Sequence, residues 1–209
     1  MRSALLVLPA ALTFAAPALA ESRSFNLSGF DKLSASALID VVLKQGPFSV
    51  KVDEPNGKFD DLKLEVRGST LLVSRQSHHD NRRIEDAPAY TVVVTAPLIN
   101  RIEVSSASTL EGKNLALKDV AIFLSSAGRI RLSGSCGAIE LTSSSGAKFE
   151  GDDLKCQTAR LTVSSGANVE AFASRKVSAT ASTGGHVTLY GKPGDVQKTT
   201  SIGGSVRLF

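Results

Sequence analysis

The sequence has no tryptophan, and aromatic residues make up only 5% of its 209 residues. Carbohydrate-binding surfaces commonly stack exposed aromatic rings against sugar faces. The sequence has only two tyrosines, Tyr90 and Tyr190, which is few for such a surface. Motifs of several enzyme classes are missing as well, since there is no Gly-x-Ser-x-Gly elbow, phosphate-binding loop or Cys-x-x-Cys pair. The sequence therefore gives no support to nucleotide-dependent or thiol-redox enzymes.

The first 20 residues have the three-part pattern of a cleavable secretory signal. A single basic residue, Arg2, precedes an apolar run that begins at Ala4, and Ala18-Leu19-Ala20 provides the small residues of a cleavage site. We therefore predict a signal peptide over residues 1–20 and an exported chain, periplasmic or at the cell surface. After it, no stretch reaches the roughly 18 consecutive apolar residues of a membrane-spanning helix, so no transmembrane segment is expected in the mature chain.

Neither sign of charge dominates the remaining chain. Removing Arg2 from the 24 basic residues leaves 23 against 20 acidic residues, a net charge of +3. Both signs are interleaved along the sequence, whereas nucleic-acid-binding domains concentrate basic residues on one face. We therefore expect no nucleic-acid partner.

A turn-like segment recurs six times from residue 105 onward. Each copy places a serine two residues before a small residue and an apolar residue three positions after that. The copies begin at Ser105, Ser125, Ser144, Ser164, Ser182 and Ser201, with spacings of 20, 19, 20, 18 and 19. A fixed period near 19 residues indicates one structural unit stacked on itself, and the serine hydroxyls are expected to bond the turn backbone or one another. Their recurrence argues against a nucleophilic serine, which is needed once.

Apolar residues recur at fixed positions on both sides of the turn. After the turn they are Leu110, Ile130, Phe149, Val169, Val187 and Val206. Before it they include Ile102, Ile122, Leu141, Leu161 and Ala179. Alternation of apolar and polar residues marks strands with one buried face, and the parity is the same on both sides. We predict an all-β, parallel β-helix (β-solenoid) with rungs of about 19 residues over residues 101–209.

The only two cysteines, Cys136 and Cys156, lie 20 residues apart, which is one repeat of the stack. Neighbouring parallel strands are about 4.8 Å apart, near the low end of the span a disulfide accepts. Export favours oxidation, so we predict a disulfide between them, with two reduced cysteines as the alternative. Neither cysteine has a second ligand at short spacing, and consecutive histidines such as His78 and His79 point apart in extended chain. We expect no metal or other cofactor.

Residues 21–100 lack the clean repeat but still have the composition of strands. Residues 40–44 and 48–52 flank Gly46-Pro47, and residues 62–66 and 71–73 flank Gly68-Ser69, so each is a hairpin-like or rung-like pair. No helix or domain linker is predicted. Residues 21–209 are therefore interpreted as one domain, with irregular strands over 21–100 preceding the regular rungs of 101–209.

An outward row of charged residues follows the turns by four positions and contains Arg131, Glu150 and Glu170. Glu150 and Glu170 would stand one rung apart, about 5 Å, a separation that a retaining glycosidase tolerates. Neighbouring basic residues, Arg131 and Lys148, instead favour an ordinary solvated ladder of charges. We keep these residues as surface candidates and assign no catalytic residue.

Four features carry a family resemblance: Phe30-Asp31-Lys32-Leu33-Ser34-Ala35, Gly46-Pro47-Phe48-Ser49-Val50-Lys51-Val52, Gly68-Ser69-Thr70-Leu71 and the serial Ser-Ser-Gly-Ala turns. Together they resemble the bacterial family called putative auto-transporter adhesin, head GIN domain, over nearly the whole mature chain. The resemblance implies a right-handed β-helix and surface adhesion, and it brings no catalytic residues. The sequence departs from the family name in lacking a literal Gly-Ile-Asn, the nearest match being Ser201-Ile202-Gly203-Gly204.

We therefore expect an exported, non-catalytic β-solenoid that presents a binding surface for an envelope protein or glycan, in cell-envelope interaction or adhesion. A carbohydrate-active β-helix enzyme, lyase or glycosidase, is the first alternative. A structural envelope protein that self-stacks through exposed rung ends is the second.

Overall fold

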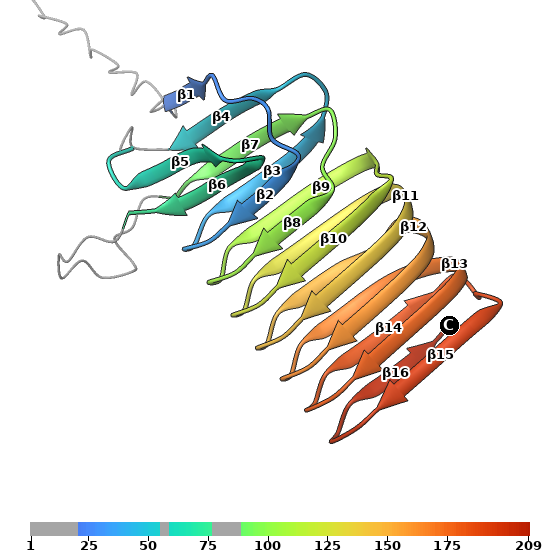
Figure 1. Cartoon of the computed structure of the whole chain (residues 1–209). Helices are drawn as coiled ribbons and strands as arrows, with labels where there is room; N and C mark the ends of the chain where they lie inside the picture. The colour runs from blue at the N-terminus through green and yellow to red at the C-terminus, as the bar shows by residue number, and fades with distance from the viewer. Residues whose placement is uncertain (1–20, 55–58, 77–88) are drawn as a thin grey trace, which may run out of the picture.

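The computed structural model describes residues 21–54, 59–76 and 89–209, and this part of the chain contains sixteen strands and no helix. The predicted signal peptide and His78-His79 lie outside the described residues. Hydrogen bonds join all sixteen strands into one continuous sheet wound into a solenoid (Figure 1). The prediction of an all-β solenoid is confirmed.

Seven strands precede the regular stack and nine form it. The first seven are β1 (Glu21–Phe25), β2 (Lys32–Ala35), β3 (Asp40–Gln45), β4 (Ser49–Glu54), β5 (Leu62–Arg67), β6 (Thr70–Arg75) and β7 (Thr91–Ala96). The others are β8 (Arg101–Val104), β9 (Thr109–Ala116), β10 (Asp119–Leu124), β11 (Arg129–Ser143), β12 (Lys148–Val163), β13 (Asn168–Ala181), β14 (His186–Tyr190), β15 (Asp195–Thr200) and β16 (Ser205–Leu208).

The stack has two faces, one on each side of the serine turns. We call face A the strands that precede the turns, namely β2, β8, β10, the second halves of β11, β12 and β13, and β15, together with β6, which pairs with β2. Face B comprises the strands that follow the turns, namely β3, β9, the first halves of β11, β12 and β13, β14 and β16, together with β7, which pairs with β3. The long strands β11, β12 and β13 cross from face B to face A at register shifts, which is how one sheet forms both faces.

The hydrophobic core lies between the two faces, in the predicted columns. On face A, Ile122, Leu141, Leu161 and Ala179 are register partners and are at most 1% exposed. On face B, the column from Leu110 to Val187 is buried as well, while Val206 is partly buried. Alternate residues point outward, so each rung contributes one apolar and one polar surface.

The serine turns are tight two-residue turns whose central residues are both left-handed. In the first, Ser106 and Ala107 have φ of 51° and 56°, and the amide of Ser108 donates to the carbonyl of Ser105 at 3.1 Å. Positive φ at both central positions is the mark of a type I′ turn. Each turn also bonds the next, for example Ala107 N to Ser126 O at 3.0 Å. The serine carbonyls close the turns, and within the described residues the six serine hydroxyls make no hydrogen bond, contrary to our expectation.

The N-terminal strands supply rungs of the same stack out of sequence order. β2 pairs in parallel with β8 and β3 with β9, so Leu33 is in register with Ile102 and Val41 with Leu110. β6 and β7 extend the stack beyond them through parallel pairing with β2 and β3. Neighbouring rungs in this region are separated in the sequence by other strands, so no 19-residue spacing marks them. The sequence pattern therefore did not reveal which strands pair.

One of the two predicted strand pairs differs from expectation. β5 and β6 form the antiparallel hairpin, but β3 and β4 do not pair with each other. β7 lies between them, parallel to β3 and antiparallel to β4. This arrangement aligns buried Val92 and Val94 with Val41 and Leu43, and so extends the core column by one more strand.

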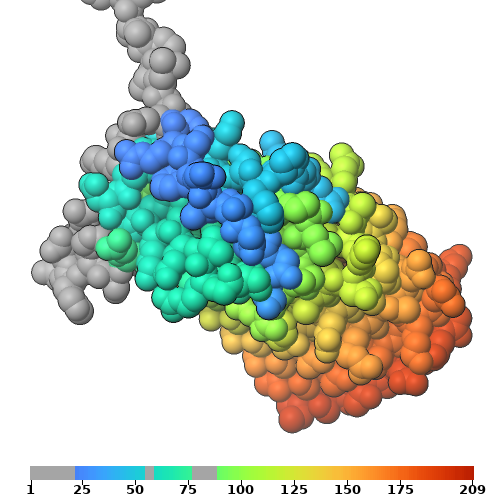
Figure 2. Space-filling model, turned by 45° about the horizontal axis from the view of Figure 1, so that its top comes forward, coloured from blue at the N-terminus to red at the C-terminus, as the bar shows by residue number. Residues whose placement is uncertain are grey.

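The antiparallel strands β1, β4 and β5 lie at the N-terminal end of the stack, where Figure 2 shows the blue and teal segments. Arg75 caps the turn between β2 and β3: its guanidinium donates to the carbonyls of Ala37 and Leu38 at 2.8 and 3.1 Å. It also forms an ion pair with Asp61 at 3.1 Å, with both side chains largely buried. These carbonyls have no preceding turn amide among the described residues, and the arginine satisfies them instead.

Candidate binding surface

The predicted outer row forms on face B. Glu111, Arg131, Glu150 and Glu170 are register partners on β9, β11, β12 and β13. They point outward because the residues that precede them, Leu110, Ile130, Phe149 and Val169, are buried. The row is therefore a continuous column of charged side chains across four neighbouring strands.

Ion pairs neutralise most of this column. The Nε of Arg131 donates to Oε2 of Glu150 at 2.6 Å, and Lys148 pairs with the same carboxylate. Glu111 pairs with Lys113 at 2.9 Å. Within the described residues, Glu170 is the acid of the column that has no ion-pair partner.

The ion pairs also set the protonation of the column. Hydrogen bonds from Lys148 and then from Arg131 hold the pKa of Glu150 below its usual value. In turn, the hydrogen bond to Glu150 raises the pKa of Arg131. A glycosidase that uses Glu150 as general acid needs a raised carboxyl pKa, so that a proton is available near neutral pH. The environment of Glu150 acts in the opposite direction.

Two shallow hollows flank the column. One, of about 250 Å³, lies over Glu111, Arg131 and Glu150. The second, of about 410 Å³, lies over Arg131, Glu150 and Glu170 and also contacts Asp152 and Asp153. No group of three or more histidine, cysteine or acidic residues in the described ranges is arranged to hold a metal ion.

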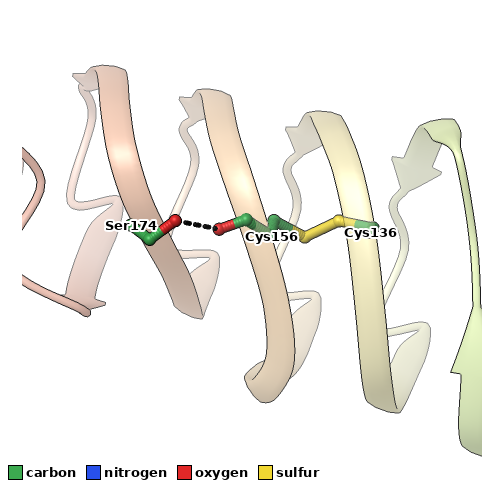
Figure 3. The surroundings of a disulfide bond; sticks show 3 residues. All are labelled: Cys136, Cys156 and Ser174. Atoms are coloured by element: carbon green, nitrogen blue, oxygen red, sulfur yellow. Dashed lines mark hydrogen bonds between the residues drawn. A yellow bond between two sulfur atoms is a disulfide. The ribbon is translucent and has the colours of Figure 1, made fainter.

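The two cysteines meet across neighbouring rungs. Cys136 and Cys156 are register partners on β11 and β12, their Cα atoms are 4.4 Å apart, and a disulfide joins them (Figure 3). Both are nearly buried, at 5% and 2% exposure. On the next rung, the hydroxyl of Ser174 donates to the carbonyl of Cys156 at 3.4 Å. The disulfide is thus a buried crosslink between β11 and β12.

Sequence reasoning missed a third hollow, which lies on face A. It has a volume of about 470 Å³ and crosses β10, β11, β12 and β13. The signal for it was present in the repeat, since Glu140 and Arg160 occupy the same outward position in consecutive copies and are register partners. The predicted surface candidates all follow the turn, although outward residues that precede the turn form columns as well.

The fold defines the class of this protein as an all-β solenoid domain. Residues 29–193 match the family described as putative auto-transporter adhesin, head GIN domain, and the chain belongs to that family. The described part of the chain has no helix long and apolar enough to cross a membrane.

Solved structures share this fold at low sequence identity. A putative adhesin from Bacteroides fragilis NCTC 9343 is 14% identical with a TM-score of 0.71, covering 90% of this chain and 96% of its own. A putative lipid binding protein from Parabacteroides distasonis ATCC 8503 is 16% identical with a TM-score of 0.51 and the same coverage. A putative adhesin from Parabacteroides merdae ATCC 43184 is 8% identical with a TM-score of 0.50, covering 90% and 95%. No curated protein matched the chain.

Proposed function

We propose that this protein is an exported, non-catalytic β-solenoid that binds a component of the cell envelope, in adhesion or envelope interaction, from the periplasm or the cell surface. The observation that carries the proposal is the membership of the adhesin-described family over residues 29–193. The predicted signal over residues 1–20 and the Cys136–Cys156 disulfide support export to an oxidising compartment. The partner is an envelope protein or glycan.

The rigidity of the stack supports a binding role. Core columns, stacked turns and the disulfide fix the backbone, so the outward side chains keep constant spacing along both faces. A preorganised surface loses little conformational entropy on binding. In this proposal Arg131 and Glu150 hold face B in shape, and Glu170 remains available to a partner.

The test measures binding of the purified protein to isolated envelope fractions of the producing cell by co-sedimentation. Saturable binding is the expected result. Protease treatment of the fraction abolishes it if the partner is a protein, and periodate oxidation abolishes it if the partner is a glycan. Absence of saturable binding to envelope fractions would contradict the proposed function.

A carbohydrate-active enzyme is the alternative that Glu150 and Glu170 allow, as register partners on adjacent strands. The Glu150→Ala/Glu170→Ala variant separates the two functions. A glycan-cleaving activity of the wild-type protein that is lost in this variant, with the circular dichroism spectrum unchanged, would replace our proposal with the enzyme.

Self-stacking is the other alternative. On β15, Lys198 and Thr200 occupy the register positions that Ala179 and Ala181 fill as core residues on β13. A lysine on an edge strand disfavours pairing with another strand. We expect a concentration-independent sedimentation coefficient, whereas concentration-dependent fibres would establish self-stacking.

A further inference from the structure

The third hollow, which we call the face A groove, crosses the four strands β10, β11, β12 and β13. Its floor contains small side chains, Ala121 on β10, Ala138 on β11 and Thr158 on β12. Neighbouring strands are about 4.8 Å apart, so the groove extends roughly 14 Å along the stack. Extended polypeptide covers about 3.3–3.6 Å per residue, so this length accommodates about four residues.

Charges of opposite sign line the two halves of this groove. Asp119 on β10 and Glu140 on β11 line one half, while Arg160 on β12 and Lys176 on β13 line the other. The order of charges along the stack is therefore acid, acid, base, base. A ligand that lies along the groove meets a negative half and a positive half.

The charges at the centre of the groove have no partner in the part of the chain that the structure describes. Glu140 and Arg160 are exposed register partners, yet no ion pair or hydrogen bond involves either side chain in the described ranges. On face B, by contrast, the equivalent acid–base neighbours Arg131 and Glu150 are bonded to each other. Lys176 is paired with Asp195 at 2.8 Å, and both of these side chains are about half exposed. Asp119 is also exposed and has no ion pair in the described ranges, so Asp119, Glu140 and Arg160 are the groove charges that remain open to a ligand.

We propose that the face A groove binds a short extended segment of a partner protein that carries one basic and one acidic side chain. The basic side chain pairs with Glu140 and Asp119, and the acidic one pairs with Arg160. The small residues of the floor admit the ligand backbone close to the sheet. Among the described residues no aromatic side chain lines the groove, so none of them offers a ring for a sugar to stack on, and the two charge signs match a polypeptide better. This inference rests on the proposed binding function and names its surface and partner.

The test is selection of a phage-displayed random hexapeptide library on the immobilised full-length protein. Enriched peptides are expected to contain a basic and an acidic residue two to four positions apart. Glu140→Gln removes the preference for the basic residue, and Arg160→Gln removes the preference for the acidic one. Each substitution weakens a selected peptide about two- to fivefold in calorimetry, as expected for exposed charge pairs.

The matched control is Arg131→Gln/Glu150→Gln, which makes the same two substitutions on neighbouring strands of face B. It should leave both the enriched sequences and their affinities unchanged. Enrichment of peptides without the charge pair, an effect of the face B variant equal to that of the face A variants, or no enrichment at all would overturn the groove assignment. If Glu140→Gln/Arg160→Gln binds the envelope fraction as tightly as the wild type does, the groove inference fails and the proposed function stands; if wild-type envelope binding is absent, the function itself fails.

Discussion

The backbone amide of Ile39 donates to the hydroxyl of Ser108 at 3.1 Å, across 69 residues of sequence. Both residues are fully buried, and the bond lies where the rung of β2 and β3 meets the rung of β8 and β9. Later turns have glycine or alanine in place of Ser108, as at Gly128 and Ala147. The hydroxyl is therefore specific to the junction between two rungs that are distant in sequence.

Replacing Ser108 with alanine should destabilise the protein. The substitution leaves the buried amide of Ile39 without its acceptor, and an unsatisfied buried donor costs about 1–3 kcal/mol. Urea unfolding followed by circular dichroism measures the difference in free energy. A change below about 0.5 kcal/mol would show that another acceptor replaces the hydroxyl.

Ser143 gives the opposite expectation for the same chemical change. It is 1% exposed, it lies in the core column between Leu124 and Val163, and its hydroxyl has no hydrogen-bond partner among the described residues. Burial of an unpaired hydroxyl is unfavourable. Ser143→Ala should therefore raise the free energy of unfolding by about 1 kcal/mol. The outward neighbour substitution Thr142→Ala is the control, with an expected change within about 0.5 kcal/mol.

Loss of the disulfide should weaken the stack. Cys136 and Cys156 close a loop with a sequence separation of 20, and restricting the unfolded chain in this way contributes about 3 kcal/mol. The Cys136→Ala/Cys156→Ala variant should unfold at a lower midpoint than the oxidised wild type, and reductant should not change the midpoint of the variant. The wild-type midpoint should fall to that of the variant only after reduction in denaturant, because both sulfurs are buried. Equal midpoints for the oxidised wild type and the variant would show that the disulfide does not stabilise the fold.

Much of the fold could be predicted because the constraint is repeated. Strand parity, the buried columns and the turns each recur at the same position, so a single alignment of the copies identifies the rungs. The position of β2 and β3 could not be predicted in this way, since the partner residues, such as Leu33 and Ile102, are joined by segments without a common period. The insertion of β7 between β3 and β4 depends on the same long-range packing.

The residues of the candidate surface could be predicted from the sequence, but the ion pairs between them could not. The sequence places Arg131, Glu150 and Glu170 in one column, and the structure has them in register. Which charges pair depends on side-chain reach within and between strands: Glu150 bonds Lys148 on its own strand and Arg131 on the next, while Glu140 and Arg160 remain apart. This difference leaves Glu140 and Arg160 available to a partner, and no linear pattern records it.

The turn at Ser182 contains a correctable strain. Thr183 has a φ of 47°, although β-branched residues rarely adopt left-handed backbone, and Gly184 follows it at 71°. Asn-Gly is the preferred central pair of a type I′ turn. Thr183→Asn should therefore raise the free energy of unfolding by about 1 kcal/mol. Thr180→Asn on the adjacent strand is the control, and it should be neutral or destabilising because asparagine is disfavoured in strands.

Acid should weaken the ladder on face B through Glu150. Its pKa is held below the ordinary value by Lys148 and Arg131, so its folded pKa is lower than its unfolded pKa. The stabilisation is therefore complete above the unfolded value, near pH 4.5, and is lost as the pH falls through the depressed folded pKa. Since the pair is at the surface, the amount is below about 1 kcal/mol. Urea unfolding of wild type and Glu150→Gln at pH 7 and pH 3 measures it: the wild type should lose its advantage at pH 3, whereas a difference that is constant over this range would show that the carboxylate does not stabilise the stack through its charge.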